Sequence, residues 1–206
     1  MPRVEAFEAL GLYCDTDFLT EAECLAYRRA MNDASSEPAA VVRTGEDVER
    51  IDETRRKVGA ASVDKATRAS LTSRLSAIRS QLQSHFRLVL DECEPPQMLN
   101  YREGGFYAVH CDSVQDTNAP AYMQKRAVSV VIFLNTPSSS VSDDGYAGGD
   151  LVFHGLMKPP FDLVGLPLES RAGTLVAFLS STVHEVRPVS HGLRQTAVTW
   201  FPGATR

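Results

Sequence analysis

The chain has 206 residues, 43% of them apolar, and its 21 Lys and Arg side chains against 26 Asp and Glu give a net charge of −5. This length and composition fit one domain with its own apolar core. The acidic balance argues against a nucleic-acid binder, and the sequence has no run of 18 apolar residues that could span a membrane.

No apolar run follows the N-terminal residues Met1–Glu5, so we expect no secretory signal and a cytoplasmic protein. Cysteines occur at positions 14, 24, 93 and 111, without a Cys-x-x-Cys pair. In a chain of this length without a signal, free thiols are expected rather than disulfides.

Residues 1–95 have a largely helical pattern and are expected to form a support region. A capping box at Thr20–Glu23 precedes a helix that extends to about Asn32. A second helix is expected to begin at Ser62 and to be stopped by the two prolines at 95–96. Its apolar residues recur at steps of three and four and therefore share one face: Leu71, Leu75, Ile78, Leu82, Phe86 and Val89.

Between these helices, residues 33–60 are polar and charged. Such a stretch is typical of a solvated loop, and a flap that faces the substrate is the alternative. The charged segment Gly45–Lys57 and the later segment Ser113–Lys125 could form mobile walls of a substrate groove. Three arginines are the candidates for facing a substrate: Arg55, Arg56 and Arg126.

After Pro96 the hydrophobic period changes to that of strands. Short β-branched runs between Gly and Pro turns are typical of a sandwich or barrel. The expected strands are 97–101, 106–110, 127–134, 150–153, 174–179, 183–186 and 195–201, with loops at 136–147 and 155–172. We therefore expect one α+β, mainly β domain over residues 1–206, in which the helices support a β core at 96–206.

His110 and Asp112 are the strongest candidates for a functional site. Residues i and i+2 of a strand point to the same face, so both side chains would enter one cavity. His184, at the start of a later strand, is the best candidate for a third ligand. Two histidines and a carboxylate form a facial triad that suits non-haem Fe(II). The remaining histidines are expected to be structural or exposed: His85, His154 and His191.

Arg194 opens an apolar strand after Pro188–Gly192, which has the composition of a hairpin turn. A strand that returns from this turn would bring Arg194 beside the metal end of the cavity. An inward guanidinium there requires an anionic partner and can bind a carboxylate through two hydrogen bonds.

Five blocks of sequence follow one another in the second half of the chain. They are LNYREGGFYAVHCD at 99–112, VIFLN at 131–135, GGDLVF at 148–153, AGTLVAF at 172–178, and HEV, GLR and WF within 184–201. In this order they resemble the Fe(II)- and 2-oxoglutarate-dependent dioxygenases, and within them the prolyl-4-hydroxylase-like branch. The resemblance spans about residues 98–202 and implies a double-stranded β-helix, a jelly-roll or cupin-like barrel with its active site in the mouth.

The resemblance also implies roles for individual residues. His110, Asp112 and His184 would bind Fe(II), Arg194 would hold the distal carboxylate of 2-oxoglutarate, and Tyr101 would donate a hydrogen bond to this co-substrate. O2 is the other co-substrate, and ascorbate is a candidate reductant. Further residues would line the cavity: Tyr107, Phe133, Leu151, Thr196 and Trp200.

Phe133 is a departure from the family pattern, because some prolyl hydroxylases have a tyrosine there that assists the arginine. Phenylalanine has no hydroxyl group, so another side chain must take this part. The candidates are Ser129, Thr174 and Thr196.

The implied reaction converts 2-oxoglutarate to succinate and CO2 and hydroxylates an unactivated C–H bond by ferryl hydrogen abstraction and rebound. A prolyl residue of a protein or peptide is the expected substrate, and a free amino acid or another small metabolite is the alternative. Nucleic-acid demethylases of the superfamily generally carry a second arginine six residues after the first, where this chain has Trp200. A metal-binding β-barrel without catalysis is the alternative from another class, although it has no need of Arg194. The oligomeric state is left open.

Overall fold

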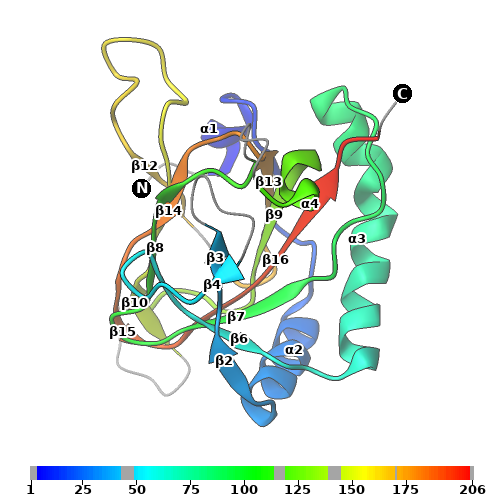
Figure 1. Ribbon diagram of the computed structural model, residues 1–206, viewed down its shortest axis with the longest axis vertical. Coiled ribbons are helices and arrows are strands. Elements are labelled where there is room, and N and C mark those ends of the chain that lie inside the picture. Colours follow the sequence, from blue (N-terminus) through cyan, green and yellow to red (C-terminus); the bar gives the residue numbers. More distant parts are fainter. Residues whose placement is uncertain (1–3, 43–48, 114–118, 139–144, 170, 205–206) are drawn as a thin grey trace.

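The computed structural model describes residues 4–42, 49–113, 119–138, 145–169 and 171–204. Two antiparallel sheets dominate it (Figure 1). The seven-stranded sheet has the order β1 (Tyr13–Asp15), β13 (Leu175–Leu179), β9 (Arg126–Phe133), β16 (Arg194–Pro202), β7 (Gln97–Tyr101), β6 (Gly59–Ala61) and β2 (Ser36–Pro38). The five-stranded sheet has the order β12 (Leu166–Pro167), β11 (Leu151–Phe153), β14 (His184–Val186), β8 (Phe106–His110) and β5 (Arg56–Lys57).

Two short strand pairs complete the β structure. They are β10 (Tyr146–Gly148) with β15 (Val189–Gly192), and β3 (Val41–Val42) with β4 (Glu49–Arg50). The helices are α1 (Val4–Glu8), α2 (Glu21–Asp33), α3 (Lys65–Phe86) and α4 (Ala121–Lys125). The expected α+β, mainly β fold is confirmed, and two facing antiparallel sheets are the arrangement of a double-stranded β-helix.

Alternation along β9 divides the apolar core into two layers. Val128, Val130 and Ile132 belong to the layer that packs against α2 and α3, whereas Val131 and Phe133 belong to the layer between the sheets. Successive residues of a strand point to opposite faces, so this largely buried strand contributes to both layers. Figure 1 shows both helices along the outer side of the larger sheet, which leaves its inner face free to form the site.

The helix that was expected to reach Asn32 is α2, and its predicted capping box is present. The Thr20 hydroxyl accepts a hydrogen bond from the Glu23 backbone N–H at 3.2 Å, and the Glu23 carboxylate accepts one from the Thr20 backbone N–H at 2.8 Å. Because two donors at the helix start are satisfied in this way, α2 begins at a defined residue.

The second helix, α3, is shorter at both ends than the sequence predicted. Asp64, rather than Ser62, caps its start by accepting hydrogen bonds from the backbone N–H groups of Ala66 and Thr67. Its last turn is closed at Arg87, which has φ of 55° and donates its backbone N–H to the Gln83 carbonyl. Val89 consequently leaves the apolar face and is 61% exposed.

The prediction of a loop over residues 33–60 was wrong for much of the segment. Strands β2 and β6 extend the larger sheet from β7, and β5 extends the smaller sheet from β8. Charged side chains are common on edge strands. The charged composition of this segment therefore favoured a loop prediction, although parts of it pair as strands. The prediction of a turn at Pro188–Gly192 was also wrong for most of its residues, because β15 covers Val189–Gly192. Parts of the proposed walls, residues 45–48 and 114–118, and of the loop 136–147, residues 139–144, lie outside the described residues.

None of the four cysteines forms a disulfide, as the sequence predicted. Within the part of the chain that the structure describes, we find no helix with the length and apolar character needed to cross a bilayer.

The corrected end of α3 leads to a stability prediction. Leu82→Ala removes a fully buried side chain between α3 and the larger sheet and is expected to lower the free energy of unfolding by about 2–5 kcal/mol. Val89→Ala is the matched control and is expected to change it by less than about 0.5 kcal/mol, because Val89 lies beyond the helix. Urea denaturation of both variants measures the difference, and equal losses would contradict the assigned helix end.

Candidate metal and co-substrate site

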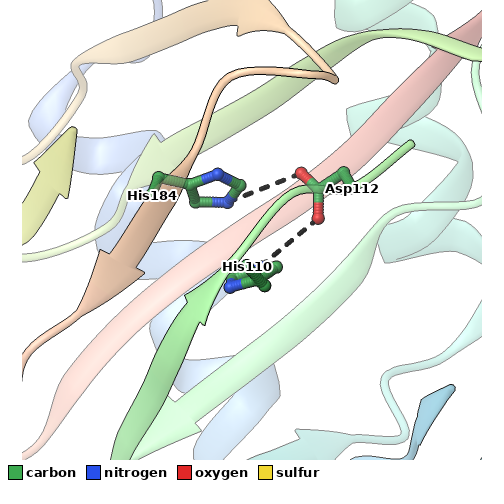
Figure 2. A group of neighbouring side chains, drawn as sticks. All are labelled: His110, Asp112 and His184. Carbon is green, nitrogen blue, oxygen red and sulfur yellow. Dashed lines mark ion pairs between the residues drawn. The ribbon is translucent and has the colours of Figure 1, made fainter. Parts of the chain in front are cut away.

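Three side chains that were expected to bind a metal meet between the sheets. His110 ends β8, His184 begins β14, and these two residues are partners across the strand pair. Asp112 lies just beyond β8, where its backbone N–H donates to the Ser180 carbonyl at 2.9 Å. Its two carboxylate oxygens lie 3.5 Å from His110 Nε2 and 3.6 Å from His184 Nε2 (Figure 2). One ligand atom from each residue lies within 4.8 Å of the others.

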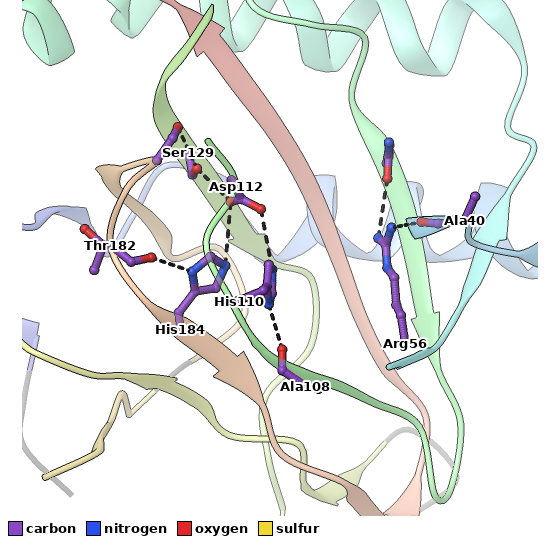
Figure 3. Close-up of polar contacts among 10 residues, drawn as sticks. Ala40, Arg56, Ala108, His110, Asp112, Ser129, Thr182 and His184 are labelled. Atoms are coloured by element: carbon purple, nitrogen blue, oxygen red, sulfur yellow. Dashed lines mark hydrogen bonds and ion pairs between the residues drawn. The ribbon is translucent and has the colours of Figure 1, made fainter. Parts of the chain in front are cut away.

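Backbone carbonyls orient both imidazole rings. His110 Nδ1 lies 2.8 Å from the Ala108 carbonyl oxygen, and His184 Nδ1 lies 2.9 Å from the Thr182 carbonyl oxygen (Figure 3). A carbonyl only accepts, so each Nδ1 carries a hydrogen, and Nε2 is the ring nitrogen left to bind a metal. Both Nε2 atoms face the Asp112 carboxylate, which is the arrangement that a metal site requires.

Asp112 is held as a carboxylate. Burial by itself raises its pKa, but His184, His110 and the Ser129 hydroxyl together bring the pKa well below its usual range. Ser129 Oγ donates to Asp112 Oδ2 at 2.7 Å and also lies 2.9 Å from Ser180 Oγ. Burial, reinforced by the nearby His110, lowers the pKa of His184 to about 4. A charged carboxylate and a neutral imidazole are the protonation states that bind a divalent cation.

Arg194 is the largest side chain that is almost completely buried, with 1% of its surface exposed. Its Nε and both Nη atoms have no hydrogen-bond partner in the described part of the chain. The guanidinium carbon lies 4.9 Å from the Tyr101 ring centre and 5.3 Å from that of Phe133. Gly149 makes room for it, because a Cβ at this position would lie 2.8 Å from Arg194 Cδ. A buried guanidinium with free donors fits a carboxylate ligand.

The three hydroxyl groups that could assist Arg194 in binding a carboxylate have different surroundings. The Ser129 hydroxyl is used by Asp112. The hydroxyls of Thr174 and Thr196 are both buried without a partner, but only Thr196 lines the cavity that also contains Arg194 and the three candidate ligands. Phe133 packs near the guanidinium without lining this cavity. Thr196 is therefore the hydroxyl group best placed to share a carboxylate with Arg194.

Three other residues that were expected to line the cavity are found in its wall: Tyr107, Leu151 and Trp200. Tyr101, the expected co-substrate ligand, lines the same cavity. The Tyr107 ring stacks on His110, with centres 3.6 Å apart and planes 16° from parallel, and burial raises the pKa of Tyr107 to about 12. The cavity thus has apolar and aromatic walls around a few polar groups, as ligand sites generally have.

The three arginines expected to face a substrate have different surroundings. Arg126 is buried, and Glu94 accepts two hydrogen bonds from it at 2.7 Å each, so its charge is already neutralised. Arg55 is exposed and lines none of the cavities described here. Arg56 is buried and lines the same cavity as the triad.

Some lining residues were missed from the sequence. Val198 lies between Thr196 and Trp200 on the cavity face of β16, and extending the alternation from Arg194 would have identified it. Leu99 could have been found in the same way from Tyr101. Ser180, which contacts Ser129, had no signal, because its position depends on the pairing of β13 with β9.

Curated proteins are similar in sequence to part of this chain. A PKHD-type hydroxylase of Klebsiella pneumoniae (strain 342) is 32% identical over 145 residues, which are 68% of this chain and 59% of the relative. One of Stenotrophomonas maltophilia (strain R551-3) is 31% identical over 112 residues, 54% of this chain and 44% of the relative. The chain thus spans about half the length of the curated relatives it matches.

Solved structures match almost the whole chain. A prolyl-4-hydroxylase of Pseudomonas putida has a TM-score of 0.71 at 24% identity, covering 98% of this chain and 97% of the other. A prolyl hydroxylase of Trichoplax adhaerens, in complex with a hypoxia inducible factor peptide, has a TM-score of 0.69 at 19% identity, covering 97% and 86%. These likenesses agree with the double-stranded β-helix fold.

A family model described as the 2OG-Fe(II) oxygenase superfamily matches residues 96–202, which are just over half of the chain. The matched range contains all three triad residues and Arg194. The resemblance drawn from the sequence is confirmed, and the chain belongs to the 2OG-Fe(II) oxygenase superfamily.

Proposed function

We propose that this protein is an Fe(II)- and 2-oxoglutarate-dependent hydroxylase. One observation carries the proposal: the His110–Asp112–His184 triad and a buried arginine without a carboxylate partner share one cavity. A triad alone would suit a metal-binding barrel. Such a barrel gains nothing from a buried cation, which costs free energy unless an anion joins it. A co-substrate with a carboxylate supplies that anion.

Each residue has a definite part in this proposal. The Nε2 atoms of His110 and His184 and the Asp112 carboxylate hold Fe(II) and leave positions for other ligands. Bound Fe(II) supplies the redox chemistry by which O2 oxidises 2-oxoglutarate to succinate and CO2 and hydroxylates a C–H bond. Arg194 and Thr196 hold the distal carboxylate of 2-oxoglutarate, with Tyr101 beside them. The apolar walls exclude water from the reacting groups.

We further propose a substrate with a proline-type ring. The PKHD-type relatives and the two prolyl hydroxylase structures support this class through their names and fold. A free amino acid or another small metabolite is the second candidate, which the buried Arg56 at the cavity favours.

The metal site is tested by anaerobic titration with Fe(II) and 2-oxoglutarate, which is expected to produce the weak visible charge-transfer band of the chelate. The band should be absent from His110→Ala, because that variant lacks one ligand. A His191→Ala variant changes a histidine on the exposed part of β15 and is the control that should keep the band. Wild-type protein without a band at saturating metal would sink the proposal.

The co-substrate site is tested by comparing two buried threonines. Thr196→Val is expected to raise the 2-oxoglutarate concentration needed for half-maximal band intensity by about tenfold, since a hydrogen bond to a carboxylate is lost. Thr174→Val removes a hydroxyl that is equally buried but lies outside the cavity, and it should leave this concentration unchanged. If the two variants behave alike, Thr196 is not part of the co-substrate site.

A further inference from the structure

Arg56 lies where the triad cavity opens into a neighbouring groove. The cavity and the groove share four lining residues: Arg56, Tyr107, Asp112 and Trp200. The groove continues past Ala40, Gln97 and Tyr122. Arg56 therefore lies on the boundary between the triad cavity and this groove.

Among the residues that the structure describes, Arg56 has no carboxylate partner. The side chain is 7% exposed. Its Nη1 donates to the Ala40 carbonyl at 2.9 Å, and its Nη2 donates weakly to the Gln97 side-chain carbonyl at 3.4 Å (Figure 3). Its Nε is buried without a partner, and no carboxylate of the described ranges forms an ion pair with it. Neutral carbonyls satisfy some donors but leave a full positive charge in a desolvated place.

Arg126, which lines the same groove, is a buried arginine whose charge is balanced by a carboxylate of the protein. It lies with its guanidinium carbon 3.6 Å from the Trp200 ring centre and is held by both oxygens of Glu94. Its charge is therefore balanced without any ligand. Arg56 is buried to a similar degree and lacks such a partner. Within the described residues, Arg194 is the other buried arginine without one, and we have assigned it to a ligand carboxylate.

The position of Arg56 relative to the metal site is fixed by Tyr107. Arg56 pairs with Tyr107 across β5 and β8, and its guanidinium carbon lies 4.8 Å from the centre of the tyrosine ring. The same ring stacks on His110. Only one aromatic ring thus separates the free cation from a candidate metal ligand, so a small molecule can contact Arg56 while its C–H bond lies at the metal.

We propose that Arg56 is a specificity-determining residue that binds a carboxylate of the molecule to be hydroxylated. The substrate is then a carboxylic acid, either a free amino acid or the C-terminal residue of a peptide. A guanidinium binds a carboxylate through two charge-assisted hydrogen bonds, and this also positions the carbon that reacts. The inference rests on the proposed hydroxylase function and adds the substrate class to it.

Binding of matched acids and amides tests this proposal. The probes are L-proline, the peptide acetyl-Ala-Pro with a free C-terminus, and the amide of each. They are titrated calorimetrically into protein loaded with Mn(II) and 2-oxoglutarate without O2. We expect at least one acid to bind at least about tenfold more tightly than its amide, and Arg56→Gln to abolish this preference. Arg55→Gln removes the same charge from the adjacent exposed position and should leave the preference intact.

The results separate this inference from the hydroxylase proposal. Formation of the Fe(II)–2-oxoglutarate band by Arg56→Gln shows that the variant is folded and that the co-substrate site is intact. With that band present, equal binding of acid and amide, binding of neither, or a preference that survives in Arg56→Gln overturns the role of Arg56. A preference for L-proline identifies a free amino acid, and a preference for the peptide acid identifies a C-terminal residue. Loss of the band in wild-type protein would instead count against the hydroxylase.

Discussion

Arg194 places a positive charge within the apolar layer between the two sheets, and this buried charge constrains the rest of the structure. A buried guanidinium is tolerated when its surroundings are rigid and when an anion can reach it. The sheet supplies the first condition, because the Tyr101 and Phe133 rings lie close to the guanidinium, and Gly149 leaves space for its stem. The cavity supplies the second condition, because it connects the free donors with the triad.

The triad and the arginines divide the chemistry of the cavity between them. His110, Asp112 and His184 offer a site for a divalent cation. The lowered pKa values of Asp112 and His184 favour the charged carboxylate and the neutral imidazole that bind such a cation. In our proposals, the positive charges of Arg194 and Arg56 each bind a carboxylate, Arg194 that of the co-substrate and Arg56 that of the substrate. Arg126 has its own carboxylate and instead holds Trp200 in place at the groove. The charges that lack a protein partner thus indicate where ligands belong.

Most of the site could be predicted from the sequence because it depends on local alternation. The pattern His110-x-Asp112 and the strand from Arg194 to Trp200 each place their side chains on one face. Other features depend on distant contacts that have no local signature. Strand β5 contains only two residues, both charged, so nothing in the sequence distinguished Arg56 from its exposed neighbour Arg55. The end of α3 was missed because Arg87, and not a glycine, adopts the left-handed conformation.

The Nδ1 contacts of the two histidines bear on how the protein acquires its metal. Each imidazole is anchored to the carbonyl two residues before it, Ala108 or Thr182, so its direction is set by its own strand. The two strands are far apart in the chain and come together only when β8 pairs with β14. An unfolded chain can therefore offer the metal a single histidine but not the complete triad. A metal that binds only the assembled triad therefore shifts the folding equilibrium toward the native state.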